Sequence, residues 1–376
     1  MTSAKVFFYV QHLLGIGHLA RASRIAAAMV ADGFEVTMVT GGMPVPGFPG
    51  PGVRHVSLPA ILSGDAGFSG ITDEHGEPVS DAFKARRAAL LLEAFTEAKP
   101  DIVIIEAFPF GRRQVRFELL PLLDAIAAAK PKPKLLTSLR DILQERTKPG
   151  RDEETVALVK AHFDHVLVHG DPAFIRVEDS FRLADEIADK VIYTGLVAAP
   201  PPRPPAERFD IVVSAGGGAV GRDLVLAAAE AARHLPHLGR WCLIAGPNLP
   251  QPDFEALSAQ ASEAVHVFRF RTDFASLLAG ARLSVSQAGY NTVCDALRGR
   301  CRMLLVPFAA GGETEQPARA RRLEAMGLAR VLTESELTPE TMRARIEAAY
   351  ALPEPPPSTL DLDGARQTAK ILRRLL

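Results

Sequence analysis

The sequence predicts an α/β protein made of two successive parallel sheets, each flanked by helices. Three observations lead to this fold class. Short apolar runs alternate with stretches of helical spacing along most of the chain, as in strand–helix–strand units. The alternation breaks at a proline-rich stretch, residues 200–205, and then restarts. A length of 376 residues, 47% of them hydrophobic, is sufficient for two domains with apolar cores.

The first strand–helix–strand unit occupies the N-terminus. Residues 5–10 are an apolar run typical of a buried parallel strand, and residues 19–32 have a helical spacing that Gly33 ends. Residues 34–40 form a second β-branched run, so the short connections predict a right-handed crossover within one sheet. The same alternation continues with helices at 85–98, 119–129 and 153–162 and strands at 101–106, 134–138 and 165–169.

The proline-rich stretch divides the chain, because it cannot continue a helix or a sheet and favours an extended linker. We therefore expect a first domain over residues 1–198, a linker over 199–208 and a second domain over 209–357. Beyond the linker the expected strands are 209–214, 240–245, 265–269, 283–286 and 302–307, and the expected helices are 222–233, 254–260, 274–279, 292–298, 317–325 and, after the prolines of 353–357, 364–376.

Composition and charge exclude several classes of protein. The 43 lysine and arginine residues nearly balance the 44 aspartate and glutamate residues, so the chain lacks the general positive field of a nucleic-acid-binding protein. His162, His165 and His169 resemble a metal site in spacing, but two of them fall on a predicted strand and do not converge on one helical face. Three scattered cysteines fit neither a disulfide framework nor a zinc site: Cys242, Cys294 and Cys301.

The chain has no predicted membrane span or signal peptide. No stretch approaches the ~18 consecutive apolar residues of a membrane-spanning helix. The apolar run at residues 5–10 is too short for a signal peptide, since the polar residues Gln11 and His12 follow at once. We expect a cytoplasmic protein, and attachment to the inner face of the membrane stays open.

The loops that follow the strands are the expected ligand sites, because parallel sheets bind ligands beyond the carboxyl ends of their strands. In the first domain Gly15, Gly17 and His18 lie between the first strand and the first helix, where the glycines let a substrate approach the backbone. The alternative is a tight turn with a capping histidine. A third glycine and an acid at the end of the second strand are missing, so a nicotinamide dehydrogenase is not favoured.

The corresponding loop of the second domain contains four glycines between a strand and a helix. Ser214 and the backbone amides of Gly216, Gly217 and Gly218 would form a cradle for a phosphate at the helix start. The Gly-Lys-Ser/Thr of a P-loop is absent, so metal-assisted transfer of a γ-phosphoryl group is not indicated. The alternative is a flexible turn.

Two further loops of the second domain carry polar residues at helix starts. One contains Gly289 and Thr292, and Asp295 lies three residues later on the same helical face, where it would bond two sugar hydroxyls. The other contains Glu315 and Gln316, which would bond a hexose-like ring. The alternatives are an ordinary first-turn acid for Asp295 and a capping box that includes Glu315.

Charged side chains also follow two strands of the first domain. Glu106, Arg112 and Arg113 come at and after the end of one strand, and Arg140 follows the next strand along the chain. Because guanidinium groups bind carboxylates and phosphates through two parallel hydrogen bonds, we expect an anionic acceptor here. A solvated basic surface is the alternative.

Together these features resemble a glycosyltransferase of the GT-B fold, in particular a branch of predicted glycosyltransferases similar to family 28. The likeness is most specific over residues 209–332. It rests on the two glycine loops, on Ala288-Gly289-x-x-Thr292-x-x-Asp295, and on Pro307 with Gln316-x-x-x-Ala320. It implies two Rossmann-like domains with a cleft between them, and a C-terminal segment, 358–376, that joins the first domain.

The resemblance also implies a role for each residue. The donor phosphates would contact Ser214, Gly216, Gly217, Gly218, Gly289 and Thr292, the base and ribose would contact Phe270, Arg271 and Asp295, and the donor sugar would contact Glu315 and Gln316. His18 would be the catalytic base or would position the acceptor, whose side would include Gly15, Gly17, Glu106, Arg112, Arg113 and Arg140. The family's usual ribose glutamate and paired glutamines are altered here, so the donor sugar and the acceptor stay unassigned.

The implied reaction is a metal-independent, inverting transfer of a sugar from a nucleotide diphosphate sugar, by default a uridine one, to an acceptor hydroxyl. No cofactor is expected. Closure about the proline linker would expel water from the reacting groups. The alternatives are a 2-epimerase or hydrolase of sugar nucleotides with the same fold, and a nucleotide-sugar-binding protein without turnover. The expected partners are the donor and an acceptor, with no nucleic acid.

Overall fold

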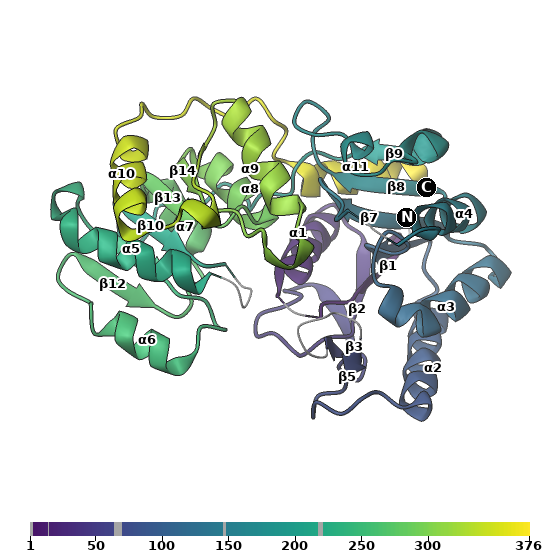
Figure 1. The fold of residues 1–376 in the computed structure, drawn as a ribbon. Helices are drawn as coiled ribbons and strands as arrows, with labels where there is room; N and C mark the ends of the chain where they lie inside the picture. Colours follow the sequence, from purple (N-terminus) through teal and green to yellow (C-terminus); the bar gives the residue numbers. More distant parts are fainter. Residues whose placement is uncertain (1–2, 14, 64–69, 146–147, 217–220) are drawn as a thin grey trace. The chain divides into compact units, whose positions relative to one another are not determined.

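The structure is a computed structural model that describes residues 3–13, 15–63, 70–145, 148–216 and 221–376 (Figure 1). The chain divides into two compact units: unit 1 contains Met1–Val197 and Asp363–Leu376, and unit 2 contains Ala198–Leu362. Each unit is an α/β domain with its own parallel sheet and its own apolar core.

Unit 1 is built on a seven-stranded parallel sheet in the order β3-β2-β1-β6-β7-β8-β9. In register, Val6 of β1 stands opposite Val36 of β2 and Ile102 of β6. The strand order reverses between β1 and β6, and such a switch point is where doubly wound sheets bind ligands. The strands are β1 (Lys5–Val10), β2 (Glu35–Thr40), β3 (Val53–Ser57), β6 (Ile102–Glu106), β7 (Lys134–Arg140), β8 (His165–His169) and β9 (Val191–Tyr193), and β4 (Leu62–Ser63) pairs with β5 (Ile71–Thr72) as a short antiparallel hairpin.

Helices complete unit 1, and the alternation of strand side chains explains their packing. Phe7 and Tyr9, two residues apart on β1, point into one core with Leu91 of α2 and Leu119 of α3. The last helix of the chain, α11, packs against α1. The helices are α1 (Gly17–Ala31), α2 (Asp81–Ala98), α3 (Arg116–Ala128), α4 (Arg151–His162) and α11 (Gly364–Leu375).

Unit 2 has a six-stranded parallel sheet in the order β12-β11-β10-β13-β14-β15, so its switch point lies between β10 and β13. Trp241 and Leu243 of β11 are fully buried in a core with Ala228 of α5 and Met342 of α10. The strands are β10 (Ile211–Ser214), β11 (Trp241–Ile244), β12 (Val265–Phe268), β13 (Leu283–Ser286), β14 (Arg302–Leu305) and β15 (Arg330–Val331), and the helices are α5 (Arg222–His234), α6 (Gln251–Ser258), α7 (Phe274–Gly280), α8 (Tyr290–Gly299), α9 (Glu315–Ala325) and α10 (Pro339–Tyr350).

The α/β class with two parallel sheets is confirmed, and the differences concern boundaries and short elements. α1 begins at Gly17 rather than at residue 19, and α2 begins at Asp81 because the Ser80 hydroxyl caps it by accepting a hydrogen bond from Phe83 N–H. The sequence analysis does not predict β3, β9 or α10. β3 is an edge strand whose Arg54 is exposed, so its apolar signal is weak.

The residues of the expected linker, 199–208, are part of unit 2. Pro205 lies so close to Gly280, at the end of α7, that a β-carbon on Gly280 would approach it to 2.5 Å. Glu207 then forms ion pairs with Arg240 and Arg271. The proline-rich stretch is therefore packed along unit 2.

The chain passes between the units twice, at Val197–Ala198 and at Leu362–Asp363. Within unit 1, Val197 and Asp363 form an antiparallel bridge. Within unit 2, Ala198 N–H donates to the Leu362 carbonyl oxygen at 3.4 Å. The ends of unit 2 are therefore neighbours.

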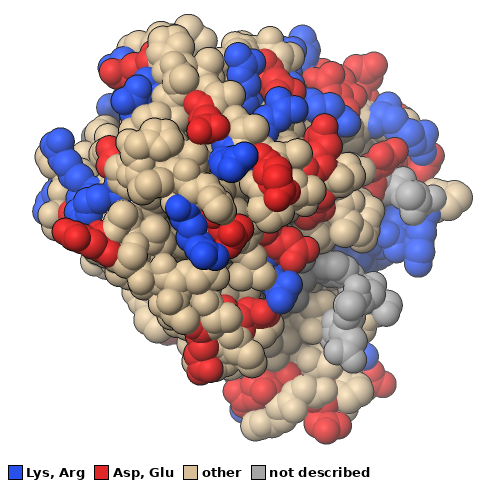
Figure 2. Space-filling view, turned by 60° about the vertical axis from the view of Figure 1, so that its left-hand side comes forward, with Lys and Arg blue, Asp and Glu red and all other residues tan. Residues whose placement is uncertain are grey.

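The surface carries charges of both signs. On the face drawn in Figure 2, acidic and basic side chains are interspersed, in keeping with the net charge of −1. Among the described residues, no helix is both long and apolar enough to span a membrane.

Candidate functional site

Unit 1 places a histidine and a glutamate together at its switch point. His18 is the second residue of α1, which follows β1, and Glu106 is the last residue of β6. His18 Nδ1 lies 2.6 Å from Glu106 Oε1, with the imidazole 21% exposed and the carboxylate fully buried. Because an ionised carboxylate only accepts hydrogen bonds, Nδ1 carries the proton and Nε2 keeps its lone pair. A histidine oriented by a carboxylate in this way can act as a general base.

Two arginines also contact the Glu106 carboxylate. Arg21, one turn after His18 on α1, places Nη2 2.5 Å from Oε1, the same oxygen that accepts from His18. Arg112 Nη2 lies 3.7 Å from the other oxygen, Oε2. One buried carboxylate is therefore shared by an imidazole and two guanidinium groups.

These charges fix the protonation states near neutral pH. Burial alone would raise the pKa of Glu106, but His18, Arg21 and Arg112 hold that pKa well below its usual range. Burial, and next Arg112, lowers the pKa of His18 to about 3, against the opposing effect of Glu106. Glu106 is therefore a carboxylate and His18 an uncharged imidazole, which is the form that accepts a proton.

The backbone after β6 is strained where these groups are presented. Ala107, with φ +63°, and Arg112, with φ +60°, both adopt the left-handed conformation that side chains other than glycine rarely adopt. Strained residues of this kind persist where the surrounding structure requires them, and they cluster at functional sites. The strain and the shared carboxylate together point to a functional site after β6.

The other residues predicted on the acceptor side have different surroundings. Arg140 ends β7, next to β6 in the sheet, and its charge further lowers the pKa of His18. Arg113 forms its ion pair with Glu154 of α4, at 2.5 Å. Gly15 precedes the N-cap residue of α1 and Gly17 is the first residue of that helix rather than part of the loop before it. Their place beside an acceptor stays a prediction.

The alternative of a capping histidine at the start of α1 is wrong. The N-cap residue is Ile16, and no side chain caps the helix there, because the His18 ring bonds Glu106 instead. The sequence analysis also missed Arg21. Its spacing of three residues from His18 puts it on the same face of a helix, which is the signal that could have found it.

Unit 2 has glycine loops at its own switch point. Ser214 ends β10, and its hydroxyl accepts a hydrogen bond from Gly216 N–H at 3.2 Å. Gly217 and Gly218 lie outside the described residues. Gly289 is the N-cap residue of α8, has no side-chain cap, and would have no described atom within 4 Å of an added β-carbon. Gly289 therefore has room beside it among the described residues, and a helix start that follows a switch-point strand is an arrangement suited to phosphate.

Thr292 and Asp295 lie one turn apart on α8 in different surroundings. Thr292 is half-buried. Asp295 is only 4% exposed, and its Oδ1 accepts a hydrogen bond from Ala199 N–H at 2.8 Å. The structure therefore gives Asp295 a contact with the segment that enters unit 2, and its bond to a ribose stays a prediction.

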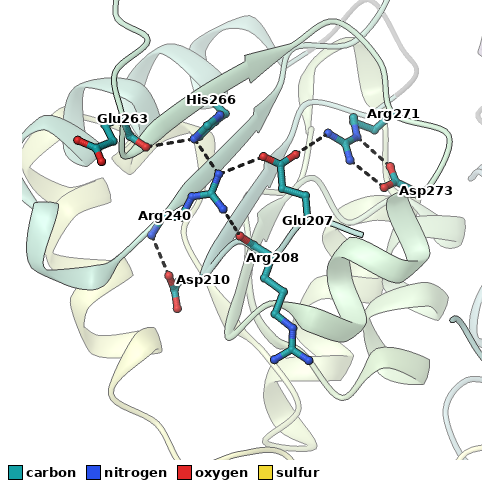
Figure 3. A network of polar contacts seen from close by, with 8 residues as sticks. All are labelled: Glu207, Arg208, Asp210, Arg240, Glu263, His266, Arg271 and Asp273. Carbon is teal, nitrogen blue, oxygen red and sulfur yellow. Dashed lines mark hydrogen bonds and ion pairs between the residues drawn. The ribbon is translucent and has the colours of Figure 1, made fainter. Parts of the chain in front are cut away.

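Phe270 and Arg271 follow β12 and differ in exposure. Phe270 is 55% exposed, and an exposed aromatic ring offers a stacking surface for a base. The Arg271 guanidinium makes two hydrogen bonds of 2.8 Å to Asp273 and reaches Glu207 at 3.3 Å (Figure 3). Glu207 also pairs with Arg240, so the Arg271 side chain belongs to a network of ion pairs.

Glu315 is buried and supports a neighbouring loop. It is 2% exposed, and its Oε1 accepts from Arg319 Nη2 at 2.7 Å. Arg319 Nη1 in turn donates to the Ala288 carbonyl oxygen at 2.8 Å, so the pair ties α9 to the loop before α8. Gln316 is partly exposed, and its Oε1 accepts from Phe308 N–H at 3.2 Å. Gln316 is therefore better placed than Glu315 to meet a donor sugar.

The capping box considered for Glu315 is not formed. The N-cap residue Thr314 makes no side-chain cap bond, and the Glu313 carboxylate accepts from the amides of Glu315 and Gln316 instead. Sequence reasoning missed Arg319 and Glu313, which act through contacts with the residues it did identify.

Unit 2 also contains an open cavity of about 610 Å³ beside the first turn of α5 and the loop after β14, with Asp223, Phe308 and Glu334 in its wall. Within the described parts of the chain, no three His, Cys, Asp or Glu side chains are grouped so as to hold a metal ion. The spacing of the three histidines near β8 produces no such group.

The family comparison concerns unit 2. Residues 212–359 match the Glycosyltransferase family 28 C-terminal domain. Two proteins named UDP-N-acetylglucosamine--N-acetylmuramyl-(pentapeptide) pyrophosphoryl-undecaprenol N-acetylglucosamine transferase are similar. The one from Geobacillus kaustophilus is 43% identical over 75 residues, 20% of this chain and 21% of the relative. The one from Rhizobium johnstonii is 31% identical over 222 residues, 57% of each. The matches thus span about a fifth and just over half of these relatives' length.

Solved structures are similar over the whole chain. A glycotransferase of kitacinnamycin superposes with a TM-score of 0.64 at 15% identity, covering 100% of both chains. MurG from Acinetobacter baumannii superposes with a TM-score of 0.58 at 14% identity, covering 98% of this chain and 99% of the other. At such identities the likeness shows the fold. The predicted GT-B fold and the predicted resemblance to family 28 are both confirmed.

Proposed function

We propose that this chain, which has the GT-B fold and carries a glycosyltransferase family 28 C-terminal domain over residues 212–359, transfers a sugar from a nucleotide diphosphate sugar to an acceptor hydroxyl. The observation that carries the proposal is the uncharged His18 imidazole oriented by the Glu106 carboxylate at a distance of 2.6 Å. A base of this kind serves sugar transfer to a hydroxyl, because the attacking oxygen must lose its proton.

In the proposed step, His18 Nε2 takes the proton of the acceptor hydroxyl. The acceptor oxygen forms a bond to the anomeric carbon while the bond from that carbon to the diphosphate oxygen breaks. A single displacement of this kind inverts the configuration at the anomeric carbon. Glu106 holds the Nδ1 proton and stabilises the imidazolium that forms, as the carboxylate does in other His–carboxylate pairs.

Unit 2 would hold the donor. The turn at Ser214 and Gly216 is at the end of β10, and Gly289, at the start of α8, follows β13. These two strands flank the switch point of unit 2. Backbone amides and a helix N-terminus stabilise the negative charge that develops on a departing diphosphate, without a cation. Phe270 would stack on the nucleobase. We propose uridine as the base, because the named relatives use a UDP sugar.

For the acceptor, the proposal specifies only the kind of group that it carries. The cations Arg112 and Arg140 beside His18 favour an acceptor that carries an anionic group. The named relatives act on an undecaprenol-linked acceptor, so contact with the inner face of the membrane is part of the proposal.

The proposal is tested first by binding. A panel of nucleoside diphosphates and nucleotide sugars is screened by thermal shift, since selective binding to the folded state raises its apparent stability. We expect a uridine diphosphate compound to give the largest shift. No shift and no calorimetric heat with any nucleoside diphosphate would contradict the proposed donor site.

Product analysis separates the proposal from its alternatives. With the donor identified, the products are compared with and without added acceptors by mass spectrometry. A glycosylated acceptor supports transfer. Free sugar or an epimerised donor, formed equally without acceptor, identifies a hydrolase or a 2-epimerase, and bound donor that is never converted identifies a binding protein.

A further inference from the structure

The contacts of Glu106 differ from those of a simple histidine–carboxylate pair. Its Oε1 accepts from both His18 Nδ1, at 2.6 Å, and Arg21 Nη2, at 2.5 Å. Both Arg21 and Glu106 are almost fully buried, with side-chain exposures of 3% and 0%. A guanidinium and an imidazole that share one carboxylate oxygen each limit where the other can sit, because an oxygen has two lone pairs in fixed directions.

The charges around His18 come from four elements or loops. Arg21 lies on α1, Glu106 ends β6, Arg112 follows it in the loop, and Arg140 ends β7. The buried His12, after β1, and His169, on β8, both have pKa values lowered by burial, so both are uncharged near pH 7. Arg112 and Arg140 lower the pKa of the His18 imidazole, and Arg21 and Arg112 lower the pKa of the Glu106 carboxylate.

A lone carboxylate beside a histidine favours the imidazolium form, which removes the lone pair that a base needs. An arginine on the same carboxylate offsets its charge and so weakens this effect. Arg112 and Arg140 thus oppose protonation of the resting His18 directly, and Arg21 opposes it by offsetting the charge of Glu106. Glu106 still fixes which ring nitrogen carries the proton.

We propose that Arg21 is a positioning residue for His18: through Glu106 Oε1 it fixes the imidazole with its proton on Nδ1 and keeps that imidazole uncharged until a substrate proton arrives. The proposal rests on the proposed function for its kinetic consequence only. It concerns a buried residue that acts on the base through the carboxylate.

Nuclear magnetic resonance of histidine side chains tests the proposal without any turnover. The His18 ring is assigned by comparison with His18→Gln and titrated in the full chain between pH 8 and pH 5. We expect one tautomer, protonated at Nδ1, and no protonation of Nε2 over this range. A His18 ring that is charged at pH 7, or that titrates like an exposed histidine, overturns the proposal, and this result needs no Arg21 variant to fold.

Substitutions then show whether Arg21 is responsible. In Arg21→Met the charge of Glu106 is less offset, so we expect His18 to become protonated within the range pH 8 to pH 5, whereas in Arg21→Lys it stays unprotonated, as in the unaltered chain. Arg54→Met, which removes an arginine from the exposed ion pair with Glu97, is the matched control and leaves His18 unprotonated over this range. A His18 ring that stays unprotonated down to pH 5 in folded Arg21→Met overturns the proposal.

The kinetic arm separates positioning from a merely structural role. Below its new midpoint, Arg21→Met loses kcat/KM by about tenfold per pH unit and recovers activity as the pH rises, since only the uncharged base reacts. A loss that is the same at every pH contradicts a role through His18. If no sugar transfer is found at all, the proposed function fails while the titration still decides the role of Arg21.

Discussion

His18 and Glu106 are 88 positions apart in sequence. They meet because His18 follows β1, Glu106 ends β6, and these two strands are neighbours in the sheet. Sequence reasoning could place each residue near the carboxyl end of a strand, but could not predict that the two side chains contact each other. The same limit applies to Arg271, Asp295 and Glu315. Each of their charged groups bonds another residue of the fold, and the sequence does not show these contacts.

The first prediction concerns the base itself. In His18→Gln we expect kcat to fall by roughly 10²- to 10⁴-fold, which is the usual contribution of a general base. The Kd for the nucleotide, measured by calorimetry, stays unchanged because the proposed donor site is on unit 2. His75→Gln, at an exposed histidine, is the matched control and keeps full turnover. Full turnover in His18→Gln would remove His18 from the proposed step.

The second prediction concerns nucleotide stacking. Phe270→Ala removes an exposed ring whose stacking on a base is worth about 1–3 kcal/mol. We expect the Kd for the nucleotide to rise by roughly 5- to 150-fold, with Phe270→Tyr close to the unaltered chain. Because the ring is exposed, the melting temperature without nucleotide should hardly change. Equal affinities for the two variants would show that the ring does not meet the base.

The third prediction links a buried histidine to the pH dependence of stability. His169 is fully buried between Ser138 and Thr194, and burial, followed by Arg21, lowers its pKa to about 3. The unfolded chain binds the proton near pH 6.5 and the folded chain does not, so the stabilisation is complete above pH 6.5 and is lost as the pH falls toward 3.

The free energy of unfolding of unit 1 should therefore drop by up to about 1.4 kcal/mol per pH unit below 6.5 on account of His169. In His169→Asn this contribution disappears. Hydrogen exchange of the β8 amides at pH 7.0 and pH 5.5 measures the difference. Equal slopes for the two proteins would show that His169 takes up its proton in the folded state.

At the scale of elements, a buried arginine joins three loops of unit 1. Arg87 of α2 is 0% exposed; it donates to Glu118 Oε2 at 2.6 Å, to Gln11 Oε1 at 2.5 Å and to the carbonyl oxygens of Gly41 and Pro59. The loops after β1, β2 and β3 are therefore fixed from one point. No periodicity signals this role, because Arg87 occupies a core position of an otherwise amphipathic helix.

The fourth prediction follows from that contact. A β-carbon on Gly41 would fall well inside contact distance of the Arg87 guanidinium and of Gln11. Gly41→Ala should lower the free energy of unfolding of unit 1 by about 1–3 kcal/mol, as overpacking of a buried site does, measured by urea denaturation. Gly70→Ala is the control, since no described atom would meet its β-carbon. Equal free energies of unfolding for both variants would mean that the Arg87 network accommodates the added methyl group without loss of stability.

The strands and the main helices could be predicted from sequence because the hydrophobic pattern specifies them locally. The runs that became β1 and β10 are apolar except for Lys5 at the start of one and Ser214 at the end of the other, as expected of parallel strands covered on both faces. β9 is also apolar, but its three residues are too few to give a recognisable strand pattern. The position of the glycine loops between a strand and a helix could be predicted from the sequence, and the side-chain partners around them could not.

At the scale of the whole molecule, the donor is expected to bind without a metal ion. If backbone amides and the start of α8 hold the diphosphate, then an excess of EDTA should change neither the Kd for the nucleotide nor kcat by more than about twofold. Calorimetry and initial rates, with and without the chelator, measure both. A loss of affinity or rate that magnesium restores would contradict a purely main-chain cradle.

The neighbouring ends of unit 2 make it an insertion within unit 1, joined at one place by two adjacent peptide segments. A segment with this connectivity can be replaced as a cassette, because grafting residues 198–362 from a related enzyme requires only two junctions that lie side by side. If unit 2 binds the donor and unit 1 the acceptor, as proposed, chimeras built at these junctions would recombine the choice of donor and the choice of acceptor independently, which gives evolution and protein engineering the same route to new glycosides.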